Sequence, residues 1–302
     1  MNQLPKLVVI QGTNASGKSG LGVKLAAHFG GEIISADSRQ VFRGLDLGSG
    51  KITPEEMQGV PHHLIDVAEP GDFFSMHDFQ RLSYTAIDDI IARGKTPFMV
   101  GGTGLYVASV AEGYLMSSSA PDLEYRDHLE TFTTPELYQM LIEQVPDIEI
   151  ERNSRNRVMR VLEKLHAGDD YVPSCEKRYE TLKLGVTWDR ETLKERIDER
   201  LERRLNEGMI EEVKGLMDAG VSTEFLYKLG LEYRFIAQYL TGEIPDKDDM
   251  ILQLGNAIKK FAKRQMTWFR RDKDIIWLDM SADPFAEAVS LITSFLSPDS
   301  VR

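Results

Sequence analysis

A run of small and charged residues near the start of the chain has the spacing of a phosphate-binding loop. Gly12, Gly17, Lys18 and Ser19 fit the pattern Gly-x-x-x-x-Gly-Lys-Ser. Glycines let the backbone curl so that several N–H groups point at one anion, and the lysine adds a positive charge. The serine hydroxyl can hold Mg²⁺ where the following helix begins. The loop therefore predicts binding of a di- or triphosphate, a class that includes ATP. Its members are Gly12, Thr13, Asn14, Ala15, Ser16, Gly17, Lys18 and Ser19.

The segments on either side of this loop support that interpretation. The apolar run 7–10 precedes the loop, and apolar residues at helical spacing, Leu21, Leu25 and Phe29, follow it. The motif requires this strand-turn-helix context, which an ordinary glycine-rich turn would not supply.

Two further polar loops also follow strand-like runs. Asp37 and Ser38 come directly after residues 32–35, and a glycine-rich stretch containing Thr103 comes directly after residues 97–100. A carboxylate near a bound phosphate could coordinate Mg²⁺ or act as a general base, although an Asp-Ser pair also caps turns and helices. The Thr103 hydroxyl can make one directed hydrogen bond, although glycine-rich stretches of this kind also form ordinary turns.

Two cationic segments stand out in a chain whose formal net charge is −12. Residues 259–271 contain six cations, no acid and the aromatic residues Trp268 and Phe269, and residues 152–160 contain four arginines. Cations beside aromatic rings suit a phosphate backbone and stacked bases, whereas a solvated helix face could also carry them. The acidic average argues mildly against a nucleic-acid partner, but two separate cationic clusters favour one.

The elements that carry these loops alternate between strand-like and helix-like segments over residues 1–117. The strand-like runs are residues 7–10, 32–35 and 97–100, and a further run at 182–188 resumes the pattern. The alternation predicts an α/β fold, a P-loop NTPase-like parallel sheet flanked by helices. In such sheets ligands bind beyond the carboxyl ends of the strands, so the three loops should converge on one edge.

The middle of the chain has a different character. Residues 118–181 are helical after a hinge-like stretch at 117–122, so we predict a small all-α domain inserted into a core of residues 1–117 and 182–302. From Arg190 to about Ala219 the four-residue spacing of apolar residues predicts one long amphipathic helix region. Its dense alternating charge predicts a solvated face rather than a binding surface.

The hydrophobicity pattern and the cysteine content of the chain indicate the cellular compartment in which we expect it. No apolar run approaches the roughly 20 residues that span a bilayer, and the first strand begins too early to leave room for a signal peptide. Cys175 is the only cysteine, which excludes an internal disulfide and suits a reducing compartment. We expect a cytoplasmic monomer with no membrane partner.

Several blocks of residues, in a fixed order, point to one family. They are Gly12–Ser19, Asp37–Gln40, Phe42–Asp46, His62–Asp66, Gly101–Tyr106, Arg157–Glu163, Gly208–Val213 and Ala262–Phe269. Together they resemble the tRNA dimethylallyltransferase family, also called tRNA isopentenyltransferases, over most of the chain. The resemblance implies transfer of a dimethylallyl group from dimethylallyl diphosphate to the exocyclic N6 of the adenosine adjacent to the anticodon, with release of pyrophosphate. It also implies that this base is flipped out into a channel and that the insertion helps to grip the anticodon stem-loop.

The implied roles agree with the chemistry of the loops. Lys18, the loop N–H groups and a Mg²⁺ ion on Ser19 would neutralise the leaving group. Asp37 would act as the base toward the adenine amine, and Thr103 would position the diphosphate or the amine. The contacts with tRNA would come from Asp37, Ser38, Arg39, Gln40, Thr103, Arg126, Asn156, Arg157, Arg160, Lys259, Lys263 and Arg264.

The chain also departs from the usual family pattern. The family usually has Gly-Thr-Ala-Lys-Pro at residues 48–52, Gly-Tyr at 230–231, Asn-Asp at 153–154 and Arg at 259. Here Ser49, Gly50, Ile52, Leu231, Ser154 and Lys259 stand in these places. These changes leave the phosphate loop intact and bear on how the acceptor is gripped.

Other activities share the phosphate loop. An adenylate isopentenyltransferase, which prenylates free adenine nucleotides, would share the fold and Asp37 but would need neither the insertion nor residues 259–271. A small-molecule kinase would use the loop for ATP, and a non-catalytic RNA-binding protein would keep only the cationic segments. The intact loop beside Asp37, together with two cationic segments, favours tRNA modification.

Overall fold

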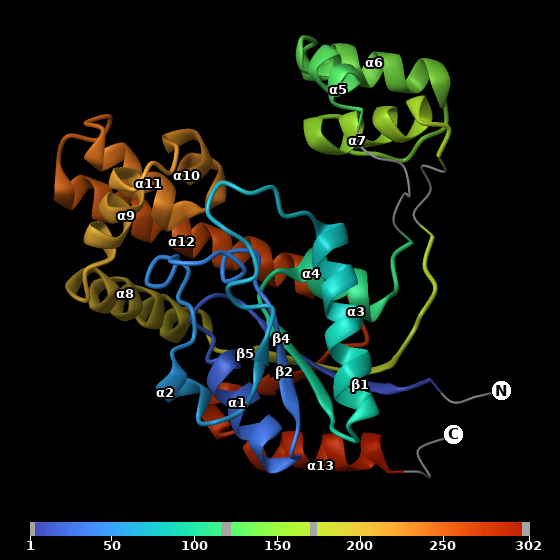
Figure 1. The fold of residues 1–302 in the computed structure, drawn as a ribbon, viewed down its shortest axis with the longest axis vertical. Helices are drawn as coiled ribbons and strands as arrows, with labels where there is room; N and C mark the ends of the chain where they lie inside the picture. The colour runs from blue at the N-terminus through green and yellow to red at the C-terminus, as the bar shows by residue number, and fades with distance from the viewer. Residues whose placement is uncertain (1–3, 116–121, 170–173, 298–302) are drawn as a thin grey trace. The chain divides into compact units, whose positions relative to one another are not determined.

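The computed structural model describes residues 4–115, 122–169 and 174–297, which form two compact units (Figure 1). The larger unit contains residues up to 112 and from 177 onward, and the smaller unit spans residues 113–176. The insertion thus starts and ends slightly earlier than the expected range 118–181. The hinge expected at 117–122 lies outside the described residues except for Asp122.

A parallel sheet of six strands in the order β3-β2-β4-β1-β5-β6 forms the centre of the larger unit. The strands are β1 Lys6–Gly12, β2 Glu32–Ala36, β3 His62–His63, β4 Pro97–Gly101, β5 Glu180–Thr187 and β6 Ile276–Asp279. The α/β fold with a P-loop-like sheet is confirmed. The sequence pattern missed β3 and β6, because β3 has only two residues and β6 is a partly exposed strand at the sheet edge.

Helices cover both faces of this sheet (Figure 1). The helices α1 Lys18–His28 and α13 Phe285–Leu296 share one apolar core with Val8 and Ile10 of β1. The helices α3 Met76–Ala92 and α4 Gly104–Ala111 share another with Leu7 and Val9. Alternate residues of a strand point to opposite faces, so a strand covered on both sides is apolar throughout.

A second layer of helices packs on the segment that follows β2. It contains α8 Arg190–Asn206, α9 Met209–Asp218, α10 Thr223–Leu229, α11 Leu231–Leu240 and α12 Lys247–Phe269. The prediction of one long helix region from Arg190 to about Ala219 is wrong in one respect, because the structure has two helices there. Gly208, at φ 102°, separates α8 from α9, because this left-handed backbone conformation cannot continue a helix. Two short elements complete the unit, α2 Pro54–Met57 and the 3₁₀ turn Met280–Ala282.

The smaller unit is helical and has its own core. Its helices are α5 Leu123–Glu130, α6 Thr134–Gln144 and α7 Arg155–His166. Leu129, Leu141 and Leu162 are fully buried between them. Asp122 caps α5 by accepting a hydrogen bond from the Tyr125 N–H at 2.9 Å. In the described part of the chain, no helix is both long and apolar enough to cross a membrane.

Candidate active site

The phosphate loop connects β1 to α1 at the carboxyl edge of the sheet. Gly17 caps α1 with φ 84°, a conformation that glycine adopts without strain. Lys18 begins the helix, and its Nζ donates to the carbonyl oxygen of Thr13 at 3.2 Å. Ser16 Oγ is buried without a hydrogen-bond partner among the described residues. An orphaned hydroxyl and the unpaired N–H groups of a helix start are what an anion requires.

Gln265 of α12 holds this loop against a second one. Its Oε1 accepts a hydrogen bond from the Asn14 N–H at 3.0 Å, and its Nε2 donates to the Gly102 carbonyl oxygen at 2.9 Å. The Gln265 side chain is buried, so each bond is shielded from water. Gln265 belongs to Ala262–Phe269, one of the blocks that carry the family resemblance, but the sequence alone predicted no role for it. Two backbone bonds to separate loops identify it as a positioning residue.

Asp37 and Thr103 lie on adjoining loops after β2 and β4. Thr103 Oγ1 accepts a hydrogen bond from the Ser38 N–H at 3.1 Å, and Asp37 Oδ1 accepts one from the Arg39 N–H at 2.9 Å. The Gln40 side chain donates to the Gly50 carbonyl oxygen at 3.1 Å. Thr103 therefore fixes the backbone of the residue next to Asp37. The Asp37 carboxylate lies at the edge of the sheet, where a ligand can reach it.

A further loop, residues 46–51, closes one side of the site and is anchored by Glu212 of α9. The Glu212 carboxylate accepts hydrogen bonds from the N–H groups of Asp46, Leu47 and Gly48 at 3.1, 2.6 and 3.0 Å. Lys51 Nζ donates to the Phe42 carbonyl oxygen at 2.9 Å. The block around Glu212 thus serves to hold a loop.

The block His62–Asp66 is also structural. Asp66 pairs with Lys51, and His63 Nε2 lies 2.8 Å from a Glu32 carboxylate oxygen. Arg93 and Lys95 bind the same buried carboxylate, so the pKa of Glu32 is held well below its usual value, with the Arg93 hydrogen bond as the main cause.

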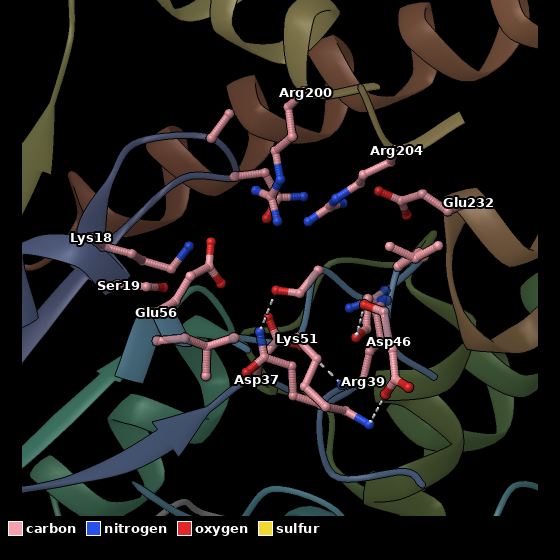
Figure 2. A pocket seen from close by; sticks show the side chains of 18 of the residues that line it. Lys18, Ser19, Asp37, Arg39, Asp46, Lys51, Glu56, Arg200, Arg204 and Glu232 are labelled. Atoms are coloured by element: carbon pink, nitrogen blue, oxygen red, sulfur yellow. Dashed lines mark hydrogen bonds and ion pairs between the residues drawn. The ribbon is translucent and has the colours of Figure 1, made fainter. Parts of the chain in front are cut away.

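A single cavity of about 910 Å³ brings these loops together, a size suited to a small-molecule ligand. It is lined by Lys18, Ser19 and Asp37, by residues 46–53 and by the inward side of α8. Figure 2 shows Arg200 and Arg204 extending from α8 toward the cavity that Lys18 enters from another side.

The expectation of a merely solvated face on α8 is therefore wrong. Arg196, Arg200 and Arg204 are spaced by four residues, so they share one face, and all three line the cavity. Arg196 Nε donates to the Ala15 carbonyl oxygen at 3.0 Å, and its guanidinium lies 4.7 Å from the Trp188 ring. The cavity-facing arginines are not distinguishable in the sequence, because charged residues occur all along α8 and the apolar spacing indicates only its core-facing side.

The electrostatics of the cavity are set by burial. Burial lowers the pKa of Lys18, while Asp37 raises it and Arg204 lowers it further. Burial also lowers the pKa of Arg204, which Glu232 partly offsets, and raises the pKa of Glu232. Nearby carboxylates thus compensate the charges of Lys18 and Arg204 only in part.

The cations of α12 fall into two groups. Lys259 Nζ pairs with Asp198 of α8 at 2.6 Å, so it is partly occupied by a protein partner. Lys263 and Arg264 are exposed. The ring of Phe261 lies beneath the guanidinium groups of Arg264 and Arg39, at 5.6 and 5.9 Å. Exposed cations beside an aromatic ring suit a nucleic-acid surface.

The inserted unit carries the remaining predicted tRNA residues. Asn156, Arg157 and Arg160 are exposed on α7. Arg160 and Arg126 both bind the Glu163 carboxylate, at 3.2 and 3.1 Å. A different arginine of this cluster, Arg155, donates to the carbonyl oxygens of Phe132 and Glu130 at 2.6 and 3.0 Å. Arg155 therefore stabilises the unit itself.

Comparison with known proteins gives a consistent result. The family model described as IPP transferase matches residues 40–272, and the model described as isopentenyl transferase matches residues 5–71. The chain is 42% identical to tRNA dimethylallyltransferase 2 of Citrifermentans bemidjiense over 96% of each chain. It is 39% identical to tRNA dimethylallyltransferase of Geobacillus thermodenitrificans over 95% of this chain and 94% of that one.

Solved structures resemble it as well. The full-length tRNA isopentenylpyrophosphate transferase from Bacillus halodurans superposes with a TM-score of 0.75 at 36% identity, over 96% of each chain. A eukaryotic dimethylallyltransferase, solved in snapshots of its action on tRNA, superposes with a TM-score of 0.83 at 26% identity. That likeness covers 97% of this chain and 79% of the other.

Proposed function

The chain belongs to the IPP transferase family, and from this premise we propose that it is a tRNA-modifying prenyltransferase. It transfers a dimethylallyl group from dimethylallyl diphosphate to the exocyclic N6 of the adenosine adjacent to the anticodon, and pyrophosphate is released. The observation that supports this most is the convergence of a phosphate loop, a carboxylate and cations of α8 on one cavity.

The leaving group is held by the phosphate loop. Lys18, the N–H groups at the start of α1 and the orphaned Ser16 hydroxyl provide donors for one phosphate of the donor. Negative charge builds on the diphosphate as its bond to the prenyl carbon breaks. Preorganised donors in a shielded site stabilise that charge and so lower the barrier. Gln265 keeps the donors in place because it ties the loop to the Gly102 backbone.

Asp37 serves the acceptor. The adenine N6 attacks the prenyl carbon, the carbon–oxygen bond to the diphosphate breaks, and one N6 proton passes to the Asp37 carboxylate. A base within hydrogen-bond reach of a reacting amine contributes about 10²- to 10⁴-fold in rate. Thr103 positions this carboxylate indirectly, because it binds the backbone of the next residue, Ser38.

Mg²⁺ suits this donor set. Among the described residues no cluster of His, Cys, Asp and Glu could form a dedicated metal cage. Mg²⁺ bound to phosphates needs only one or two protein ligands, and the Ser19 hydroxyl lines the cavity where the diphosphate would lie. When bound, the ion would neutralise charge on the diphosphate oxygens.

The acceptor tRNA is gripped by exposed cations. Lys263 and Arg264 on α12 and Arg157 and Arg160 on α7 supply cations for phosphates, and the Asn156 amide on α7 can donate to a phosphate oxygen as well. Arg39, Phe261 and Arg264 form a surface on which a base extruded from its stack can pack. Extrusion costs a few kcal/mol, which such contacts must offset.

The test is a modification assay with unmodified tRNA and dimethylallyl diphosphate, followed by mass spectrometry of the nucleosides. We expect one added dimethylallyl group, on the N6 of the adenosine next to the anticodon. Prenylation of free adenine nucleotides with no product on tRNA would instead favour an adenylate isopentenyltransferase.

A further inference from the structure

The guanidinium of Arg204 lines the cavity without a protein partner among the residues that the structure describes. Arg204 of α8 is 8% exposed, and its side chain makes no hydrogen bond or ion pair with any described residue. Its neighbour Arg203, in contrast, points to solvent and pairs with Glu207. The nitrogen atoms of Arg204 are open to the cavity, so the donors of a largely buried cation face the space where an anion would bind.

The loop of residues 46–51 approaches the Arg204 guanidinium closely at Gly50. A Cβ added at Gly50 would lie 1.4 Å from a terminal nitrogen of Arg204 and 2.1 Å from one of Arg200. Gly50 also has φ +63°, which residues with side chains rarely adopt. A glycine at this position therefore lets both guanidinium groups approach the loop without a clash.

The charges around Arg204 keep it available. Glu232, at the start of α11, is 9% exposed and is the acid that affects Arg204 most, followed by Asp37 among the acids. Glu232 forms no ion pair with Arg204 in the described structure, so it offsets the charge without occupying the guanidinium donors. Lys18 is close enough for Arg204 to influence its protonation.

We propose that Arg204 binds the terminal phosphate of the prenyl donor, as a second anchor for a diphosphate whose other phosphate lies in the phosphate loop. The inference rests on the proposed function for the identity of the donor. Arg200 and Arg204 lie four residues apart and extend from one helix face toward the cavity that Lys18 enters (Figure 2). A guanidinium presents parallel donors that match phosphate geometry, and the same contact holds pyrophosphate before it leaves.

The test compares inorganic pyrophosphate with inorganic phosphate, each titrated calorimetrically into the full chain in the presence of Mg²⁺. Arg204→Gln should weaken pyrophosphate binding about tenfold to a hundredfold, the range for one lost charge-assisted contact. It should leave phosphate binding nearly unchanged, because phosphate needs only the loop. Gly50→Ala, which displaces Arg204, should weaken pyrophosphate binding as well. Arg190→Gln removes an exposed cation from the start of the same helix, outside the cavity, and should have no effect.

The outcomes separate this inference from the proposed function. Equal pyrophosphate affinity in the wild type and Arg204→Gln would overturn the inference. So would a loss of anticodon stem-loop binding in Arg204→Gln with pyrophosphate binding intact. Prenyl transfer by the wild type is measured in parallel. Absent transfer with Arg204-dependent pyrophosphate binding would overturn the proposed function and support the pyrophosphate site.

Discussion

The cations that line the cavity and the cations of the inserted unit are held in different ways. In the cavity, Arg204 has no protein partner among the described residues, and Lys18 donates to a carbonyl oxygen rather than to a carboxylate. In the inserted unit, Arg126 and Arg160 are exposed and share the Glu163 carboxylate.

This difference separates two kinds of phosphate recognition. The side chains of Arg126 and Arg160 are 46% and 50% exposed, so we expect the guanidinium donors that do not bind Glu163 to be open to an RNA phosphate, while the Glu163 carboxylate, only 9% exposed, stays paired. Buried unpaired cations cost stability in the free protein and give it back when the anion arrives. We therefore expect the cavity to bind one small anion and the α7 surface to contact a long polyanion.

The largest effect on turnover should come from substitution of Asp37, the proposed base, which is needed for catalysis but not for tRNA binding. Asp37→Asn removes the base but keeps the side-chain shape, so we expect turnover to fall about 10²- to 10⁴-fold with nearly unchanged tRNA affinity. Asp218→Asn, which removes an exposed carboxylate at the end of α9 and outside the cavity, is the control and should leave turnover unchanged. Single-turnover transfer at the wild-type rate by Asp37→Asn would show that this residue is not the base.

A smaller loss is expected at the phosphate loop. Lys18→Met removes one donor to the leaving group, so we predict a fall of about 10²- to 10³-fold in kcat, typical of a lost transition-state donor. Lys24→Met changes an exposed lysine on the same helix and should leave kcat as it is. If only the KM for the prenyl donor rose, Lys18 would be a binding group without a role in bond cleavage.

The Gln265 clamp should give an intermediate effect on both stability and rate. Gln265→Leu leaves the Asn14 N–H and the Gly102 carbonyl group without their partner, so we expect a loss of about 1–3 kcal/mol in the free energy of unfolding and a reduced kcat. Thr267→Ala, on the exposed side of α12, serves as control. An unchanged kcat in Gln265→Leu would mean that the loop keeps its position without the clamp.

The sequence predicted most of the local motifs and missed many of the contacts between segments that lie far apart in the chain. The phosphate loop, the position of Asp37 after β2 and the sheet followed from periodicity and turn chemistry. The roles proposed for Arg204 and Gln265 did not follow, because each depends on a helix far along the chain folding back over the sheet edge. The break at Gly208 was equally hidden, since its flanking segments share one helical pattern.

The smallest effects should come from the exposed cations. Lys263→Ala and Arg264→Ala should each weaken tRNA binding and lower the slope of log K against log salt by about 0.7 to 0.9, as for one lost phosphate contact. Lys259→Ala should change the slope less, because Asp198 already pairs with that lysine. Equal slopes in the wild type and the Lys263 and Arg264 variants would exclude α12 as a contact surface.

One reaction tests the central claim most directly, that the cavity holds a departing diphosphate and not a nucleotide used for phosphoryl transfer. The protein is mixed with unmodified tRNA, labelled dimethylallyl diphosphate, ATP and Mg²⁺, and the prenylated tRNA, pyrophosphate and ADP are measured together. We predict one pyrophosphate for each prenyl group on tRNA and no ADP. ADP formation without prenylated tRNA would contradict the account.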